Sequence, residues 1–119
     1  MANDNDFITY LLELLEPLGS VVAKTMFGGF GVYSHDLMFG LVSQDTFYLK
    51  ADDENRADFE GKGLHRFTYQ RKGKELSMSY YQAPPEAMDN SEKLCGWAQK
   101  AYDAALRASK NRPQKKRKV

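Results

Sequence analysis

Apolar and polar residues alternate through much of residues 21–82, with the period of two that β-strands show. The alternation breaks at short stretches rich in glycine, proline or charged residues, as turns and loops require. The strands that this pattern predicts cover residues 21–27, 31–35, 37–43, 46–50, 64–70 and 75–82. Both faces of 37–43 are apolar, so we expect this segment to be a central strand covered on both sides.

Two flanking segments have apolar residues at helical spacing instead. Residues 6–15 carry a leucine-rich stripe, with Asp6 as the expected N-cap and Pro17 ending the helix. The second helix is expected to begin near Asp89, which has capping-box spacing from Glu92. Its apolar stripe consists of Leu94, Trp97, Ala98, Ala101, Ala105 and Ala108. Small side chains of this kind permit close approach to a sheet or to a second copy of the helix.

Residues 51–63 interrupt the strands with a run of polar and acidic side chains. One or two helical turns are expected there, capped by Asp52 or Asp53 and anchored by Ala57 and Phe59. The run 52–54 lacks the ligand spacing and the fixed glycine of a calcium loop, so a solvated loop or helix cap is favoured.

A cluster of glycine and aromatic residues, Met26-Phe27-Gly28-Gly29-Phe30-Gly31-Val32-Tyr33, joins the first two expected strands. Glycine reaches positive φ cheaply, so such a cluster marks a sharp bend or a close backbone crossing. The motif has no following Lys-Ser/Thr pair and precedes a strand, which disfavours a phosphate-binding loop. We interpret it as a structural corner made by Met26, Phe27, Gly28, Gly29 and Gly31.

The 119 residues suit one compact domain, expected at 1–108, with a basic tail at 109–119 that we expect to be disordered. Residues 1–106 hold all 16 acidic but only 10 of the 17 basic residues, a net charge of −6. Residues 107–119 hold the other 7 basic residues and no acid. The tail residues that would contact nucleic-acid phosphates are Arg112, Lys115, Lys116, Arg117 and Lys118. A nuclear-import-like address, native or added, and a merely solubilising end are the alternatives.

Residues able to carry chemistry are few and scattered. His35 and His65 are the only histidines and have no metal-ligand spacing, so turn and strand roles are favoured over a metal site. Cys95 is the only cysteine and has no nearby histidine in sequence, which favours a structural thiol over a nucleophile. The sequence therefore predicts no catalytic residue, no metal and no cofactor. Its aromatic pairs, such as Tyr80-Tyr81, indicate core or interface positions rather than stacking platforms for nucleic acid.

The compartment is predicted from two absences and the single cysteine. The N-terminus lacks the basic and apolar regions of a signal peptide, and no stretch reaches the ~20 apolar residues of a membrane span. The single thiol fits a reducing environment. We expect a cytoplasmic protein with no membrane association.

Several short motifs, taken in their order and spacing, resemble the N-terminal domain of the TfoX/Sxy competence-regulator family. They are residues 24–33, Phe39-Gly40, residues 48–52, residues 78–81, Pro84-Pro85-Glu86 and Trp97-Ala98. The resemblance covers roughly residues 7–108. It implies an α+β fold with a curved antiparallel sheet of five to six strands, flanked by N-terminal and C-terminal helices and similar to secretion-chaperone-like domains, which commonly dimerise. It also implies a bacterial, cytoplasmic regulator, and it carries over no catalytic or ligand-binding residue.

These observations predict a non-enzymatic interaction domain, a homodimer that acts as a transcriptional co-regulator with a transcription factor or another protein as partner. The contact surface is expected to be the sheet or the alanine-rich helix, and DNA is a possible partner of the tail. Two alternatives stay open. One is nucleic-acid binding through the basic tail, and the other is a small hydrolase or ligand-binding protein that uses the sheet face near His65.

Overall fold

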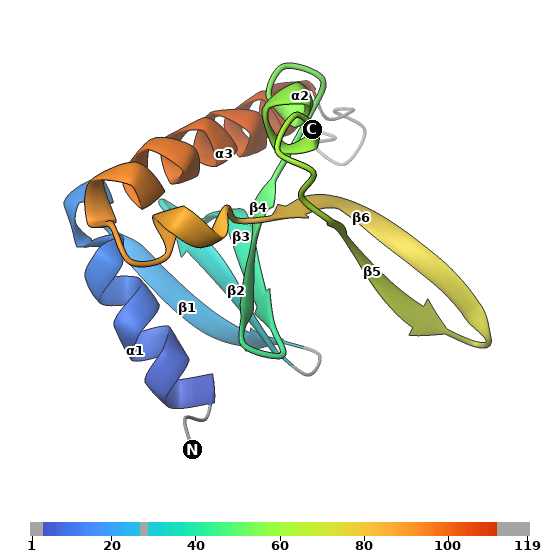
Figure 1. Cartoon of the computed structure of the whole chain (residues 1–119), viewed down its shortest axis with the longest axis horizontal. Coiled ribbons are helices and arrows are strands. Elements are labelled where there is room, and N and C mark those ends of the chain that lie inside the picture. Colours follow the sequence, from blue (N-terminus) through green and yellow to red (C-terminus); the bar gives the residue numbers. More distant parts are fainter. Residues whose placement is uncertain (1–3, 27–28, 112–119) are drawn as a thin grey trace, which may run out of the picture.

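Six strands form one antiparallel sheet in the computed structural model, which describes residues 4–26 and 29–111 (Figure 1). The strands are β1 (Val21–Met26), β2 (Gly29–Ser34), β3 (Leu37–Ser43), β4 (Thr46–Lys50), β5 (Arg66–Arg71) and β6 (Lys74–Gln82), in the spatial order β1-β2-β3-β4-β6-β5. The α-helices are α1 (Asp4–Leu14), α2 (Arg56–Glu60) and α3 (Ser91–Asn111), with 3-10 turns η1 (Glu16–Leu18) and η2 (Pro85–Ala87). The predicted α+β class, a sheet flanked by terminal helices, is confirmed.

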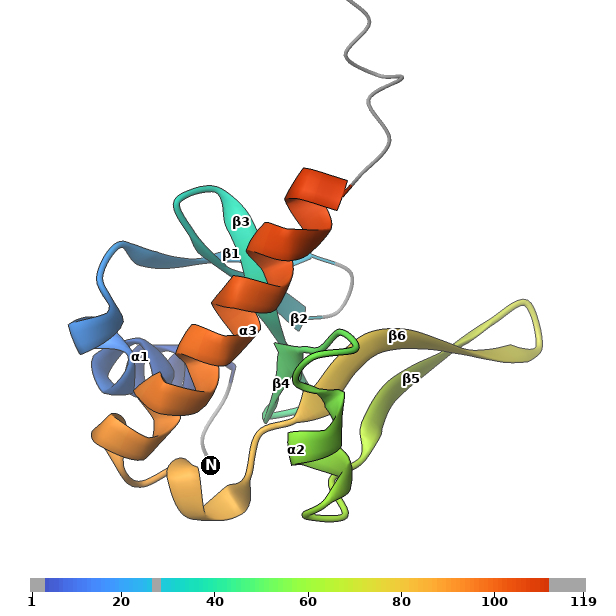
Figure 2. The same cartoon turned by 90° about the horizontal axis from the view of Figure 1, so that it is seen from above.

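The helices α1 and α3 lie on one face of the sheet, and the β5–β6 hairpin extends away from the body on the other side (Figures 1 and 2). Only residues 80–82 of β6 pair with β4. The rest of the hairpin, residues 66–79, is here called the arm. None of the helices within residues 4–26 and 29–111 combines the length and hydrophobicity needed to cross a lipid bilayer.

The strand boundaries follow the alternation closely. The predicted bounds of β3 and β4 are confirmed, whereas β2 begins at Gly29, two residues before the predicted start. Phe27 and Gly28, two residues of the predicted corner, lie outside the described residues. The two-residue turns at His35-Asp36, Gln44-Asp45 and Lys72-Gly73 have positive φ at both positions, between 51° and 79°. This is the pattern of type I′ turns, whose twist matches that of the strands they join.

The two long helices begin at other residues than the sequence suggested. The helix α1 begins at Asp4, so Asp6 lies inside it rather than capping it. At α3 the predicted Asp89–Glu92 capping box is wrong, because Asn90 Oδ1 accepts the Lys93 backbone N–H at 2.9 Å. Asp and Asn are both good N-cap residues, and Asp89 and Asn90 are adjacent in the sequence, so the residue types alone do not decide between them.

The start of α3 is tied to the end of α1 by two side chains. Ser91 Oγ donates to the backbone carbonyl of Leu14 at 2.6 Å, and Cys95 Sγ donates to the same oxygen at 3.4 Å. These bonds satisfy a carbonyl that the last turn of α1 leaves without a helical partner. Cys95 thus has the structural role that its sequence position indicated.

The small-residue stripe of α3 is buried against the sheet. Ala98, Ala101 and Ala104 have no exposed surface, and Ala105 is 6% exposed. The stripe differs from the prediction at two positions: Ala104 belongs to it, and Ala108 is exposed. Because alanine has a minimal side chain, the helix axis lies close to the sheet and covers its largest buried rings, Phe39 and Phe47.

The segment after β4 forms a tight polar turn that α3 holds in place. Asp52 Oδ1 accepts the backbone N–H groups of Glu54 and Asn55, and the buried Asn55 side chain bonds the backbone at Lys50 and Asp52. Arg107 of α3 binds both carboxylate oxygens of Asp52, at 2.6 and 2.9 Å. The Arg107 hydrogen bond lowers the pKa of Asp52 below its usual value.

Short α2 follows this turn and docks through one ring. Phe59 is fully buried between Tyr81 and Trp97, whose ring centroids lie 5.3 and 5.2 Å away. Asp52, one of the two expected caps, accepts backbone N–H groups of Glu54 and Asn55, which precede the first residue of α2. Ala57, predicted as a second anchor, is exposed.

Glycines of the central strands are required for space rather than for positive φ. A Cβ at Gly29 would lie 2.1 Å from the backbone carbonyl oxygen of Val42. A Cβ at Gly40 would lie 2.6 Å from the Phe47 ring. The glycine cluster was expected to mark either a sharp bend or a close backbone crossing, and the geometry at Gly29 supports the close crossing.

We predict that Gly29→Ala lowers the free energy of unfolding by about 2–3 kcal/mol, because the added methyl group meets rigid backbone. Gly31→Ala is the matched control. Its Cβ would contact the side chains of Tyr33, Met26 and Met38 at 2.9–3.1 Å, and the methionines can shift. Its cost is expected below about 1 kcal/mol. Urea denaturation of both variants measures the difference, and equal losses would contradict the assignment.

Candidate functional site

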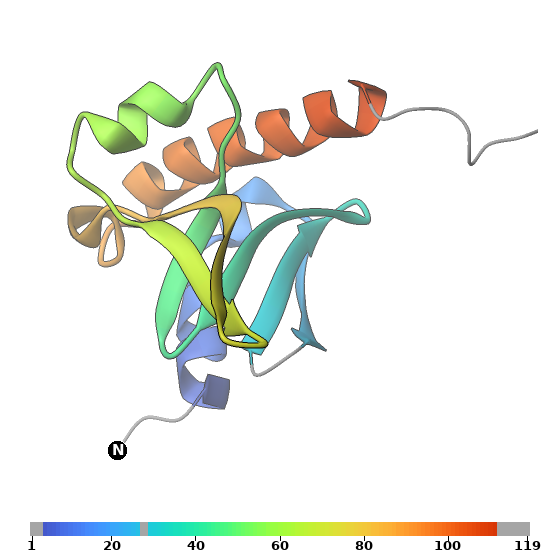
Figure 3. The same ribbon diagram turned by 90° about the vertical axis from the view of Figure 1, so that its right-hand side faces the viewer.

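The face of the sheet opposite α1 and α3 is here called the open face. Its side chains alternate along each strand with those that pack into the core. It comprises Val22, Lys24 and Met26 of β1, Gly31 and Tyr33 of β2, Met38 and Leu41 of β3, Tyr48 and Lys50 of β4, and Tyr80 of β6. Within the described residues no helix covers this face, and Figure 3 shows the arm lying in front of it with α1 behind the sheet.

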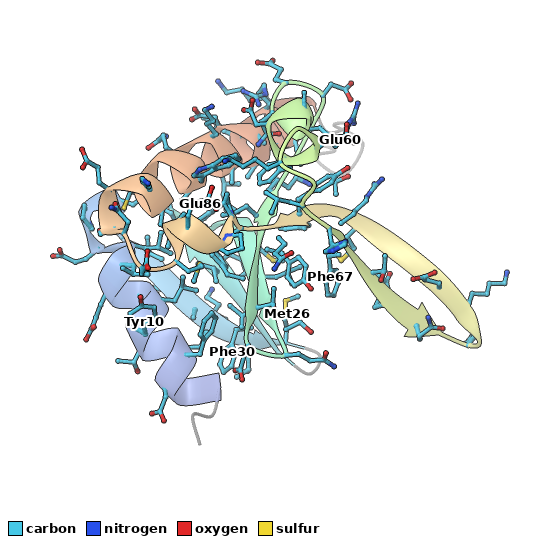
Figure 4. All side chains as sticks on the ribbon, viewed as in Figure 1. Tyr10, Met26, Phe30, Glu60, Phe67 and Glu86 are labelled. Atoms are coloured by element: carbon cyan, nitrogen blue, oxygen red, sulfur yellow. The ribbon has the colours of Figure 1, made fainter. Side chains whose placement is uncertain are left out.

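A groove of about 360 Å³ runs between the open face and the arm. Its lining is mostly apolar and consists of Met26, Gly29, Phe30, Leu41, Val42, Ser43, Phe67, Tyr69, Gln70 and Met78. Met26 and Phe67 lie on the arm side of the sheet in Figure 4, whereas Tyr10 projects from α1 on the opposite side. The ring of Phe67 meets that of Tyr48 edge to face, with centroids 4.9 Å apart, and so links the arm to the sheet.

Two lysines of the open face lie over tyrosine rings. Lys24 Nζ is 4.9 Å from the centroid of the Tyr33 ring, and Lys50 Nζ is 5.3 Å from that of Tyr80. Such cation–π contacts hold the aliphatic stems along the sheet and keep the ammonium groups close to the surface. The open face is therefore apolar at the groove and positively charged beside it.

Tyr80 is the most perturbed ionisable group of this face. It is 5% exposed, and burial, with a smaller contribution from neighbouring Tyr33, raises its pKa to about 12. Burial disfavours the phenolate, so the tyrosine stays neutral at physiological pH. The ring of this neutral tyrosine supports the ammonium group of Lys50.

The residues considered for chemistry are not assembled into a site. His35 is exposed in the β2–β3 turn with its ring near that of Tyr102, and His65 is exposed just before β5. Neither lines the groove. Within residues 4–26 and 29–111 no group of three His, Cys, Asp or Glu side chains is placed to hold a metal ion. The acidic run at 52–54 instead forms the turn held by Arg107.

The basic tail lies outside the described residues from Arg112 onward, so nucleic-acid contact by Arg112, Lys115, Lys116, Arg117 and Lys118 stays a prediction. The helix α3 continues to Asn111. Of the predicted corner motif, Met26 lines the groove and Gly29 contacts the backbone of β3.

The lysine–tyrosine pairs of the open face do not follow from the sequence pattern. Lys24 and Tyr33 are nine positions apart, and Lys50 and Tyr80 are thirty apart. The alternation does place each of these four residues on the face of its strand that is turned away from the core. Their pairing, however, depends on the strand order β1-β2 and β4-β6, which alternation does not encode.

A single helical layer on an antiparallel sheet, with an open, partly apolar second face, places the protein among small α+β domains with a surface available for binding. The chain belongs to the TfoX N-terminal domain family, whose model matches residues 13–105. The resemblance stated from its motifs is thereby confirmed.

Two relatives extend this comparison. The chain is 26% identical over 105 residues to Protein Sxy of Escherichia coli (strain K12), an alignment that covers 88% of this chain and 50% of that protein. It is 33% identical over 69 residues to DNA transformation protein TfoX1 of Aliivibrio fischeri, which covers 58% of this chain and 33% of that protein. The matched region thus spans half or less of each relative.

We predict that Tyr80 ionises with a midpoint of about pH 12 and that Tyr80→Phe removes its component from the late phase of an ultraviolet absorbance titration, in which Tyr81 takes part because burial raises its pKa as well. The pKa of Tyr80 in the folded protein exceeds the ordinary value of 10.0, so the unfolded chain loses this proton at a lower pH than the folded protein does. The contribution of Tyr80 to the free energy of unfolding is therefore fully present below pH 10 and is lost between pH 10 and 12. The total loss is roughly 2–3 kcal/mol. A wild-type titration without that component would contradict the burial argument.

Proposed function

We propose that this protein is a non-enzymatic regulatory domain that binds a protein partner on its open face and so co-regulates transcription. The observation that carries the proposal is the apolar groove between the sheet and the arm. Contiguous apolar surface facing solvent is costly unless a partner covers it, and such surfaces mark interaction sites in soluble proteins.

The composition of the groove favours a binding surface over a reaction site. Met26 and Met78 contribute flexible, polarisable side chains that adapt to differently shaped partners. The polar side chains of its lining, Ser43, Tyr69 and Gln70, include no general base and no carboxylate. Hydrogen bonding and apolar contact are the interactions that this lining can provide.

Of the two contact surfaces expected from the sequence, the open face is the better candidate. The alanine-rich face of α3 is already buried against the sheet and has no surface to offer. The groove between the open face and the arm, by contrast, is lined by the partly exposed Met26, Phe67 and Met78 and by the more exposed Tyr69. The proposal therefore assigns partner binding to the open face alone.

The family supports a regulatory role. One relative is named a DNA transformation protein, and the matched region is one part of that longer protein. A domain that acts through contacts can work inside a longer regulator or by itself. We therefore propose regulation of genes for DNA uptake, through a transcription-factor partner, as the specific role.

We predict that Met26→Glu/Phe67→Glu abolishes regulation, because two carboxylates in the groove oppose burial against an apolar partner. The measurement is RNA sequencing of a bacterial host without its own TfoX-family genes, expressing either the wild-type chain or the variant. The wild-type chain should change a defined set of transcripts, and the variant should not.

Tyr10→Glu is the control for this experiment, since Tyr10 is exposed on α1 and faces away from the groove. It should regulate like the wild type, and circular dichroism checks that both variants fold. If the double variant regulates normally, the open face is not the site. If the wild-type chain changes no transcript, the regulatory proposal itself fails.

The homodimer stays a prediction and has its own measurement. Light scattering at micromolar concentration is expected to give about twice the chain mass of 13.6 kDa. Since the alanine-rich face of α3 is buried, the interface has to use another surface, and a dimer through the open face would compete with the proposed partner. A dimer that persists in Met26→Glu/Phe67→Glu is therefore the expected result. A wild-type monomer would contradict the prediction.

A further inference from the structure

Strands β1–β4 contain no Asp or Glu, although residues 1–106 as a whole have a net charge of −6. The charged side chains that these strands place on the open face are Lys24 and Lys50. The acidic surface of the domain is therefore supplied by its helices and by the turns and loops outside the arm, since the arm itself holds four basic residues and one acid. The open face is a local region of the opposite sign.

Lys24 and Lys50 have no acidic partner among the described residues, unlike four other cations of the domain. Arg56, Lys62, Lys100 and Arg107 each form an ion pair with a carboxylate. For Lys24 and Lys50, by contrast, no carboxylate among the described residues lies within 4.0 Å of the ammonium nitrogen. Their cation–π contacts leave the N–H donors available to an incoming anion.

The two lysines lie beside the groove on the open face. Lys24 is the neighbour of Met26 on the same face of β1, and Lys50 is the neighbour of Tyr48, whose ring contacts Phe67 of the groove. They stand on β1 and β4, three strand spacings apart, so their Cα atoms are separated by on the order of 15 Å. About ten residues of a helix span this distance.

From this arrangement we infer that the groove binds a protein segment that combines apolar side chains with carboxylates, the apolar side chains entering the groove and the carboxylates pairing with Lys24 and Lys50. The inference rests on the proposed function and specifies the chemistry of its partner. Apolar contact supplies the affinity, and the lysines fix orientation and exclude basic segments.

A protein segment fits this face better than nucleic acid does. Nucleic-acid affinity depends on neutralising many phosphates, whereas the strands of the open face offer two lysines, and Arg66, Lys72 and Lys74 of the arm lie outside the lining of the groove. The groove is lined by methionine and aliphatic side chains as well as rings. Methionine-containing apolar grooves suit amphipathic peptide segments.

Selection from a phage-displayed library of random peptides on the immobilised wild-type chain tests the inference. Peptides that also bind Met26→Glu/Phe67→Glu are removed, so that only ligands of the open face remain. The enriched sequences are expected to contain several apolar residues and to have net negative charge. Lys24→Glu/Lys50→Glu should weaken the binding of these peptides at least about tenfold. Two ion pairs of up to ~1 kcal/mol each are lost, and repulsion between carboxylates takes their place.

Lys93→Glu is the matched control, an exposed lysine at the start of α3, and should leave the affinity unchanged. Enriched peptides of neutral or positive charge, or the absence of any enriched peptide, would overturn the inference. So would a single-stranded thymidine oligonucleotide that binds the open face and displaces the peptides. If Lys24→Glu/Lys50→Glu regulates transcription normally while Met26→Glu/Phe67→Glu does not, the proposed function survives and this inference fails.

Discussion

The close contact of α3 with the middle of the sheet determines the rest of the structure. Ala98 and Ala101 are fully buried there, and their small side chains bring the helix near β3 and β4. The same helix fixes its neighbours, since Ser91 bonds the end of α1 and Arg107 binds Asp52. Replacing alanine by a larger residue would separate the layers and loosen each of these contacts at once.

One helical layer covers one face, so the sheet has to shield its other face with its own side chains. Leu41 is 2% exposed and Tyr80 is 5% exposed, although no helix lies over them in the described part of the chain. Long side chains of Tyr, Met and Lys lie along the sheet and provide this cover. The groove forms where the cover is incomplete, because the arm diverges from the sheet beyond the Tyr48–Phe67 contact.

The sequence predicts the bounds of the helices and strands better than it predicts which of them lie side by side in the fold. Alternation gives the bounds of β3 and β4, and the alanine stripe gives the packing face of α3, because both patterns are local. The cap of α3 was placed at Asp89 rather than Asn90, since two adjacent residues can accept the same kind of hydrogen bond. The course of the arm and the pairing of Lys50 with Tyr80 depend on strand order, which no local pattern contains. The sheet was therefore expected as a contact surface, whereas the groove and the lysine–tyrosine pairs on that surface were not.

Net charge is a poor guide to what such a domain binds. Residues 1–106 have a net charge of −6, but the sign at a surface depends on which residues the strands bring there. At a separation of more than about 8–10 Å, salt screens exposed charges from one another, so the acids of distant turns act weakly on the open face. Lys24 and Lys50, held on tyrosine rings beside an apolar groove, give the open face its positive charge. The chemistry of a partner is thus set by a few side chains that the sheet assembles, rather than by the sum over the chain.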